Sequence, residues 1–293
     1  MTTIAKTIVA TGATSGIGFE AIKQLLSQSQ PRNLILGARD VKTTIDAYSG
    51  LKYDDSKHTI TILPLELNNL KTVKSFAQRA LGELGSGPID YLMLNAATAM
   101  SKTVAERGPH GSKWIEPYLV NHLSQHYLLH LLRPKLEQSK TRVVVVSSGA
   151  VRGVKDPSTL EDEMLVAKDT GRGVYSATKF IQLLSTHWWR RQLPGCVVVA
   201  VSPGLIPDTG LTRGSDIKIP DNLPDAKSVP EGAQSVLRAF TRDDLPEDPE
   251  QIFLTSWGEW WPKDIYGLTL DQKLQEKWSP SQEEIESEEG ITS

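Results

Sequence analysis

The sequence predicts an α/β fold, in which a doubly wound parallel sheet of about seven strands carries helices on both faces. Three features predict it: short apolar runs, helical patterns between them, and a glycine-rich turn after the first run. The runs are rich in Val, Ile and Leu along their whole length, which is typical of strands buried on both faces. Strands that alternate with helices form right-handed βαβ units, and these build a parallel sheet.

The expected elements follow from hydrophobic periodicity. The apolar runs predict strands at 7–11, 33–37, 59–65, 90–95, 142–148, 196–202 and 250–256. Apolar residues at helical spacing predict helices at 19–28, 70–84, 117–138, 175–193 and 230–242. Pro134 is expected to end or kink the third helix, because proline lacks the N–H that continues a helix. The segment around Tyr48 and Tyr53 is expected to be a polar connection.

Length and composition limit the organisation. With 293 residues the chain is near the upper size for one core, so we expect a single domain over 1–280, with a Pro/Gly-rich substrate-loop region at about 205–230. Residues 281–293 are acidic and are expected to form a solvated tail. The net charge of −3 gives no reason to propose nucleic acid as a partner. The sequence shows no secretory leader and no apolar stretch of ~18 residues, so a cytoplasmic location without a transmembrane segment is expected.

Cysteine and histidine give little reason to propose a metal. The single cysteine, Cys196, excludes an internal disulfide framework and is expected to be a buried, inert thiol. His122, His126 and His130 are spaced four apart, but no carboxylate or cysteine pattern completes a site around them. We therefore expect these histidines to be structural and the chain to have no metal site.

The turn after the first strand reads T-G-x-x-x-G-x-G. Gly12, Gly16 and Gly18 allow a tight turn and let backbone N–H groups approach a pyrophosphate at the positive end of the following helix. Thr14 and Ser15 add hydroxyl donors. A turn of this kind, at the first strand–helix junction of a parallel sheet, predicts a dinucleotide site.

The end of the second strand, "LILGARD", bears on the choice of dinucleotide. An acidic residue there would bind the ribose diol of NAD(H). Ala38 and Arg39 occupy the strand end instead, and the Arg39 guanidinium can meet a 2′-phosphate. Asp40 follows and is expected to cap a helix or to be solvated. The sequence therefore favours NADP(H) over NAD(H).

A tyrosine precedes a lysine by four residues at three places, in the pairs Tyr48/Lys52, Tyr53/Lys57 and Tyr175/Lys179. On a helix this spacing puts both side chains on one face. Only the third pair opens a strongly periodic helix. A phenol titrates near ~10, and a neighbouring ammonium lowers its pKa, so this pair predicts proton chemistry.

Six motifs occur in one order along the chain. They are "TGATSGIG" (11–18), "NAA" (95–97), Asn121 in "VNHL", "VVVVSS" (143–148), "YSATK" (175–179) and "SPG" (202–204). In these motifs the chain resembles the short-chain dehydrogenase/reductase family over roughly residues 7–210. The resemblance implies a Rossmann-like sheet, nicotinamide chemistry and a catalytic set that maps onto Asn121, Ser148, Tyr175 and Lys179.

The resemblance implies a role for each of these four residues. Tyr175 exchanges a proton with the substrate oxygen, and Ser148 hydrogen-bonds that oxygen. Lys179 lowers the pKa of Tyr175 and holds the nicotinamide ribose. Asn121 lies at a local helix distortion and binds a water that supplies protons to Lys179. The cofactor contacts expected are Gly12, Thr14, Ser15, Gly16, Ile17, Gly18, Arg39, Glu66, Leu67, Asn95, Ala96, Tyr175, Lys179, Pro203, Gly204, Ile206 and Thr209.

The chain departs from the family pattern at several points. Leu94 and Ala97 replace the usual asparagine and glycine around Asn95, and Glu66 stands where an aspartate is usual. Ser148 and Tyr175 lie 27 residues apart, and the extra stretch in 152–173 is interpreted as a flap over the pocket. This insertion is similar to those of the retinol-dehydrogenase-like and protochlorophyllide-reductase-like branches.

The sequence thus predicts an NADP(H)-dependent oxidoreductase that interconverts a carbonyl and an alcohol, more readily as a reductase. The substrate is expected to be a hydrophobic small molecule, such as a lipid-like ketone or a secondary metabolite. Two alternatives stay open, namely a non-catalytic NADP(H)-binding sensor or scaffold and a non-redox enzyme on the same fold. The resemblance also implies that the helices at 117–138 and 175–193 form the interface of a homodimer or homotetramer.

Overall fold

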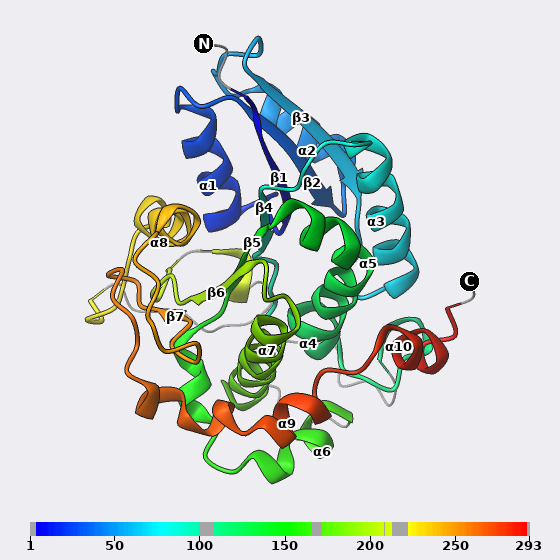
Figure 1. The fold of residues 1–293 in the computed structure, drawn as a ribbon, viewed down its shortest axis with the longest axis vertical. Helices are drawn as coiled ribbons and strands as arrows, with labels where there is room; N and C mark the ends of the chain where they lie inside the picture. The colour runs from blue at the N-terminus through cyan, green and yellow to red at the C-terminus, as the bar shows by residue number, and fades with distance from the viewer. Residues whose placement is uncertain (1–3, 100–107, 166–171, 208, 213–221, 292–293) are drawn as a thin grey trace.

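A computed structural model describes residues 4–99, 108–165, 172–207, 209–212 and 222–291. Its sheet has seven parallel strands in the order β3-β2-β1-β4-β5-β6-β7, which confirms the predicted fold class (Figure 1). The strands are β1 (Lys6–Thr11), β2 (Arg32–Ala38), β3 (His58–Pro64), β4 (Tyr91–Leu94), β5 (Arg142–Val146), β6 (Val197–Val201) and β7 (Phe253–Leu254). The order reverses between β1 and β4, and in such sheets ligands bind at the carboxyl ends of the strands around this point.

Two apolar layers cover the sheet. Alternate residues of β1 point to opposite faces, so Val9 lies in one cluster and Ile8 and Ala10 in the other. The Val9 side is covered by α3 (Leu70–Leu84), α5 (Ser124–Ser139) and α7 (Arg172–Gln192). The other side is covered by α1 (Gly16–Leu26), α2 (Val41–Ser49) and α8 (Val229–Thr241).

The long helical pattern at 117–138 is interrupted. It consists of α4 (Glu116–Tyr118), a π-helical segment at Leu119–Leu123, and α5. Pro134 lies inside α5, which continues to Ser139, so of the two expected effects, an end or a kink, the proline does not end this helix. The helix survives because its packing against α3 and the sheet offsets the missing N–H.

The polar connection expected around Tyr48 is the helix α2. Asp40 caps its N-terminus, because the carboxylate accepts a hydrogen bond from the Thr43 N–H. Tyr48 is buried and donates its hydroxyl hydrogen to the carbonyl oxygen of Ala13, at 2.6 Å. The tyrosine thus supports the glycine turn from behind, a role that its polar sequence surroundings hide.

The acidic segment at 281–293 is not the solvated tail expected from the sequence. Residues 282–288 form α10 (Gln282–Glu288), and Ile285 and Ile291 are buried in the core cluster that contains α5. The Tyr127 hydroxyl of α5 donates to Glu286 at 2.6 Å. Glu283, Glu284 and Glu288 are exposed while the two isoleucines face inward, so composition alone concealed an amphipathic element.

Residues 271–291, which we call the C-terminal segment, also cover α7. It contains α9 (Gln272–Lys277), whose Glu276 accepts a hydrogen bond from the Trp188 indole at 2.8 Å. Trp278 is buried against Trp114 and Tyr118. Parts of the two helices expected at a subunit interface are therefore covered by the chain itself.

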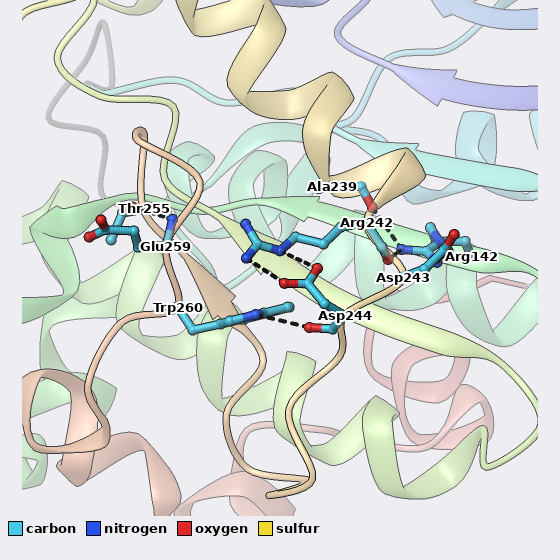
Figure 2. A network of polar contacts seen from close by, with 8 residues as sticks. All are labelled: Arg142, Ala239, Arg242, Asp243, Asp244, Thr255, Glu259 and Trp260. Carbon is cyan, nitrogen blue, oxygen red and sulfur yellow. Dashed lines mark hydrogen bonds and ion pairs between the residues drawn. The ribbon is translucent and has the colours of Figure 1, made fainter.

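The segment after α8 is tied to β5 at the opposite end of the strand from the carboxyl edge. Arg142 donates to the carbonyl oxygens of Ala239 and Arg242, at 3.1 and 2.7 Å (Figure 2). Arg242 in turn pairs with Asp244, whose carbonyl oxygen accepts a hydrogen bond from the Trp260 indole (Figure 2). These contacts attach the segment after α8 to the start of β5 and to Trp260, which follows β7.

The stretch predicted as a flap contains short helices. Gly149–Gly153 and Pro157–Thr159 form 3₁₀ turns, and α6 spans Leu160–Leu165, while 166–171 lie outside the described residues. Further 3₁₀ turns span Pro109–Gly111, Gly210–Thr212 and Lys263–Leu270. Cys196 is buried with a free thiol, as expected. No helix among the described residues is long and apolar enough to cross a membrane.

Candidate active site

The glycine turn lies tightly against the end of β4. Gly12 has a φ of +65°, and a Cβ there would lie 2.6 Å from the backbone of Ala96. A Cβ on Gly18 would lie 2.1 Å from the carbonyl oxygen of Gly12. Any side chain at either position would therefore clash with backbone, so both glycines are needed for this turn.

The start of α1 keeps unused polar groups. Ser15 is the N-cap residue, but its hydroxyl makes no capping hydrogen bond, and both Thr14 and Ser15 are exposed. The Asn95 amide nitrogen donates to Gly12 O at 2.7 Å, while its buried Oδ1 finds no hydrogen-bond partner among the described residues. Exposed hydroxyls and such a carbonyl beside a helix N-terminus suit a bound polar ligand.

The segment after β6 packs onto this turn. The Thr209 side chain lies 3.8 Å from the place of a Cβ on Gly16. The Ile206 and Ile17 side chains lie 2.6 and 3.0 Å from the place of a Cβ on Gly232 of α8. Gly204 follows Pro203 and has a φ of +95°, where a Cβ would meet Lys227 at 2.7 Å. The structure thus brings Thr209 and Ile206 to the predicted glycine turn, while Gly204 lies against Lys227 and Asp225.

The other predicted cofactor residues lie at the ends of β2 and β3. Arg39 directly follows β2 and is exposed, and no hydrogen bond or ion pair of its guanidinium is found among the described residues. The Glu66 N–H donates to Thr72 Oγ1 at 3.0 Å, so its backbone is fixed by α3. Leu67 is different, since its side chain is packed in the core and its carbonyl accepts from Ser124.

Ser148 and Tyr175 meet at the end of β5. Ser148 is extended and its Oγ accepts a hydrogen bond from the Ala150 N–H at 3.1 Å. Tyr175 lies in the first turn of α7 and shares a hydrogen bond with Ser148, which lowers the tyrosine pKa. Burial has the larger effect and raises the pKa of Tyr175 to about 12. The phenol is therefore protonated at neutral pH.

Lys179 lies one turn further along α7 and is buried. Its Nζ donates to Val146 O at 2.9 Å and to Gln182 Oε1 at 3.1 Å, and lies 5.8 Å from the centre of the Tyr175 ring. Burial lowers the pKa of Lys179 to about 7. Burial dominates the pKa of Tyr175 in this structure, and the lowering of that pKa by Lys179 stays a prediction.

Asn121 occupies the π-helical segment, so the helix distortion predicted at this residue is present. Its side chain is buried and bonds both backbone groups of Thr98, at 2.7 and 2.8 Å, and Thr178 Oγ1 at 3.0 Å. The backbone carbonyl oxygen of Asn121 accepts a hydrogen bond from Gln182 Nε2 at 2.9 Å. A protein amide thus lies where the sequence led us to expect a water between Asn121 and Lys179.

Comparison with known proteins identifies the family. The family model described as short chain dehydrogenase matches residues 6–159, which is more than half of the chain. A short-chain dehydrogenase/reductase of Pestalotiopsis microspora is 56% identical over 290 residues, covering 97% of this chain and 99% of that protein. This chain belongs to the short-chain dehydrogenase/reductase family. It is therefore a member of a family of oxidoreductases.

Other members of the short-chain dehydrogenase/reductase family resemble the chain more distantly. Retinol dehydrogenase 12 of Homo sapiens is 31% identical over 82% of this chain and 74% of its own length, which supports the similarity to the retinol-dehydrogenase-like branch. An NADPH-bound carbonyl reductase from chicken fatty liver is 20% identical and superposes with a TM-score of 0.65, covering 88% of this chain and 94% of the reductase. At this identity, the superposition shows a shared fold.

Sequence reasoning missed two glutamines of this family member. Gln182 bridges Lys179 and Asn121, and Gln125 donates to the carbonyl oxygens of Ala96 and Val120, both at 2.9 Å. The π-helical segment displaces helix hydrogen bonds, and the two amides satisfy carbonyls around it. The signal in the sequence was a polar residue on the buried face of each helix. A search for hydrophobic periodicity does not assign a role to such a residue.

The three histidines of the helix at 117–138 lie in a separate network. His126 accepts a hydrogen bond from the Trp189 indole at 2.8 Å, and its Nε2 lies 2.8 Å from Pro280 O. Burial lowers the pKa of His122 to about 4 and that of His126 well below 6.5, so both are neutral at pH 7. Among the described residues, no group of three or more His, Cys, Asp and Glu could hold a metal ion.

Proposed function

We propose that this chain is an NADP(H)-dependent oxidoreductase that interconverts a carbonyl and an alcohol, more readily as a reductase. The observation that carries the proposal is that Tyr175 lies beside both Ser148 and Lys179 at the carboxyl edge of the sheet. A phenol whose pKa is about 12 holds a proton that it can give to the oxygen of a carbonyl as that oxygen becomes an alkoxide. Asn121, Ser148, Tyr175 and Lys179 form the proposed catalytic set.

The residues around the glycine turn fit the cofactor. The α1 N-terminus and the uncapped Ser15 would bind the pyrophosphate, and the unpaired Asn95 Oδ1 offers an acceptor beside it. The exposed guanidinium of Arg39 would bind a 2′-phosphate, and two similar structures are described with NADPH and 5-hydroxy-NADP. When bound, the cofactor would supply or accept the hydride.

The substrate class is a hydrophobic ketone, aldehyde or alcohol. Ser148 would hydrogen-bond the reacting oxygen while Tyr175 exchanges the proton. Beside Ser148, the Trp261 ring lies 3.8 Å from the place of a Cβ on Gly149, and Val151 is buried among aromatic residues. The name of retinol dehydrogenase 12 also points to a bulky apolar alcohol for that relative.

The cofactor assignment is tested by titrating NADPH and NADH against the wild type and Arg39→Ala, following tryptophan fluorescence. We expect the wild type to prefer NADPH, and Arg39→Ala to weaken NADPH binding by about 10- to 100-fold while NADH binding changes little, since only a charge-assisted hydrogen bond is lost. Lys52→Ala removes an equally exposed cation away from β2 and is the matched control. Equal affinity of the wild type for both cofactors would contradict the Arg39 assignment.

The chemistry is tested by following NADPH oxidation with a panel of hydrophobic ketones and aldehydes. Turnover by the wild type supports a reductase. Binding of NADPH without turnover in either direction over the whole panel favours a sensor or scaffold instead. Exchange of substrate hydrogen with solvent, without net oxidation of NADPH, would indicate non-redox chemistry.

A further inference from the structure

Gln182 links two residues of the proposed catalytic set. It lies on α7 one turn after Lys179, and its side-chain amide spans from Lys179 Nζ, at 3.1 Å, to Asn121 O, at 2.9 Å. All three side chains are buried, with exposed fractions of 0% for Asn121, 1% for Lys179 and 4% for Gln182. The bridge is therefore shielded from solvent, where a hydrogen bond contributes most.

The orientation of this amide is determined by its neighbours. The backbone carbonyl oxygen of Asn121 can only accept a hydrogen bond, so it must face the NH₂ end of the Gln182 amide. The Gln182 carbonyl end is then turned to Lys179, whatever the protonation state of the lysine. Together with Val146 O, it presents two acceptors to the Nζ, and an ammonium donates to acceptors better than a neutral amine does.

Among the described residues, the groups that bond the Lys179 amine are neutral oxygens. Among the described residues, Tyr175 on α7 is the titratable group that faces Lys179, at 5.8 Å from Nζ to the ring centre. His122 and His126 line a cavity of about 20 Å³ beside Gln182, and both are neutral because burial lowers their pKa values. Strand β5 contributes the Val146 carbonyl. The two carbonyl oxygens are thus the groups that offset the burial of the ammonium.

We propose that Gln182 is a positioning residue that fixes the place of the Lys179 amine and favours its protonated form. The bridge itself is seen in the structure, and its catalytic consequence rests on the proposed function. When Tyr175 gives up its proton it becomes a phenolate, and a positive charge on Lys179 stabilises that anion. Gln182 therefore acts on the reaction through Lys179 without touching the substrate.

The first test is a titration of Lys179 in the cofactor-free protein. Protein labelled with ¹³C at lysine Cε is followed by NMR against pH, and the Lys179 signal is assigned with Lys179→Arg. Gln182→Met removes the acceptor and is expected to lower the Lys179 midpoint by about one to two pH units, the size of one hydrogen bond to a charged group. Gln182→Glu places a carboxylate there and is expected to raise the midpoint.

The two variants separate positioning from packing. Both lose the donor to Asn121 O, but they change the charge next to Lys179 in opposite directions, which a merely structural role would not do. Gln125→Met is the matched control, because Gln125 also donates to Asn121 O, at 3.3 Å, and does not bond Lys179. Unchanged midpoints in both Gln182 variants, or an equal shift in Gln125→Met, would overturn the proposal.

The second readout is the pH dependence of kcat for carbonyl reduction. The basic limb, where Lys179 loses its proton, is expected to move to lower pH in Gln182→Met and to higher pH in Gln182→Glu. If the Lys179 midpoints measured by NMR move but the basic limbs of the kcat profiles do not, Gln182 does not act on the reaction through Lys179. A wild type that reduces no carbonyl would defeat the proposed function alone, because the NMR titration decides the Gln182–Lys179 coupling without turnover.

Discussion

Two buried polar networks lie one after the other along helix α7. Near the carboxyl edge of the sheet, the π-helical segment before α5 and α7 bring together Asn121, Lys179 and Gln182. Further along α7, His126 of α5 bonds Trp189 and the Pro280 carbonyl of the C-terminal segment. Both networks are buried, and both contain bases whose pKa values burial lowers.

The difference between the networks lies in what they hold. The first holds an amine whose pKa is about 7, next to a phenol that can give a proton. The second holds imidazoles that are neutral at pH 7 and that bond backbone carbonyls 150 or more residues away. It therefore attaches the C-terminal segment to α5 and the helical turn before it. Burial and a shifted pKa thus do not by themselves mark a catalytic site; a reactive partner within reach does.

The largest effect is expected from Tyr175→Phe. Loss of a positioned proton donor lowers turnover by about 10²- to 10⁴-fold. The unfolding free energy should change little, because the substitution keeps the aromatic ring and removes one hydroxyl, which bonds Ser148. Steady-state kinetics and urea unfolding on the same preparation check both parts. Full turnover in the variant would remove the distinction between the two networks.

The second network is tested by Trp278→Ala. This indole is 3% exposed and packs against Trp114 and Tyr118, so its truncation is expected to cost about 3–5 kcal/mol of unfolding free energy. Urea unfolding measures the loss, and Trp278→Phe, which keeps a ring, should lose less. A change below about 1 kcal/mol would mean that the C-terminal segment is loosely attached.

Acid is expected to destabilise the second network through protonation of His122. His122 titrates near 6.5 when unfolded and has a pKa of about 4 when folded, so the unfolded chain binds more protons across that window. The unfolding free energy therefore falls as pH falls, by about 2–3 kcal/mol between pH 7 and 4.5 from this residue. His122→Gln keeps a donor for Trp278 O but does not titrate. An unaltered pH slope in that variant would show that other groups govern acid sensitivity.

The smallest effect is expected at the surface of the same network. Glu276→Gln removes the ion pair with Arg191 but keeps an acceptor for the Trp188 indole. Because the pair is largely exposed, its loss should cost less than about 1 kcal/mol and should vanish at high salt. Urea unfolding at low and high salt checks this, and a loss of several kcal/mol would place Glu276 in the core of the attachment.

The sheet and the glycine turn were predictable because their signals are local. Strand β5 is valine from Val143 to Val146, and only a strand buried on both faces suits such a run. Gly12 and Gly18 are needed because the turn leaves no room for a Cβ. The role of Tyr48 behind the glycine turn was not predictable, and the catalytic role of Tyr175 stays a prediction.

What sequence reasoning missed depends on distant contacts. Helix α10 has seven residues and is rich in glutamate, so it would be marginal alone. It is stabilised by the burial of Ile285 and by the bond from Tyr127 to Glu286. The pKa of Tyr175 depends on burial, which no spacing reveals. Gln182 follows Lys179 by three residues, yet only the fold shows that its other end reaches Asn121.

The attachment of the C-terminal segment has a consequence for how the chain is made. Helix α5 leaves the ribosome long before its partners do, since the Tyr127–Glu286 bond spans 159 residues. At synthesis rates of ~5–20 residues per second, the face of α5 that meets α10 stays uncovered for about 10–30 s. The face of α5 that meets α10 is therefore exposed on the nascent chain during that interval, when exposed apolar surface favours aggregation.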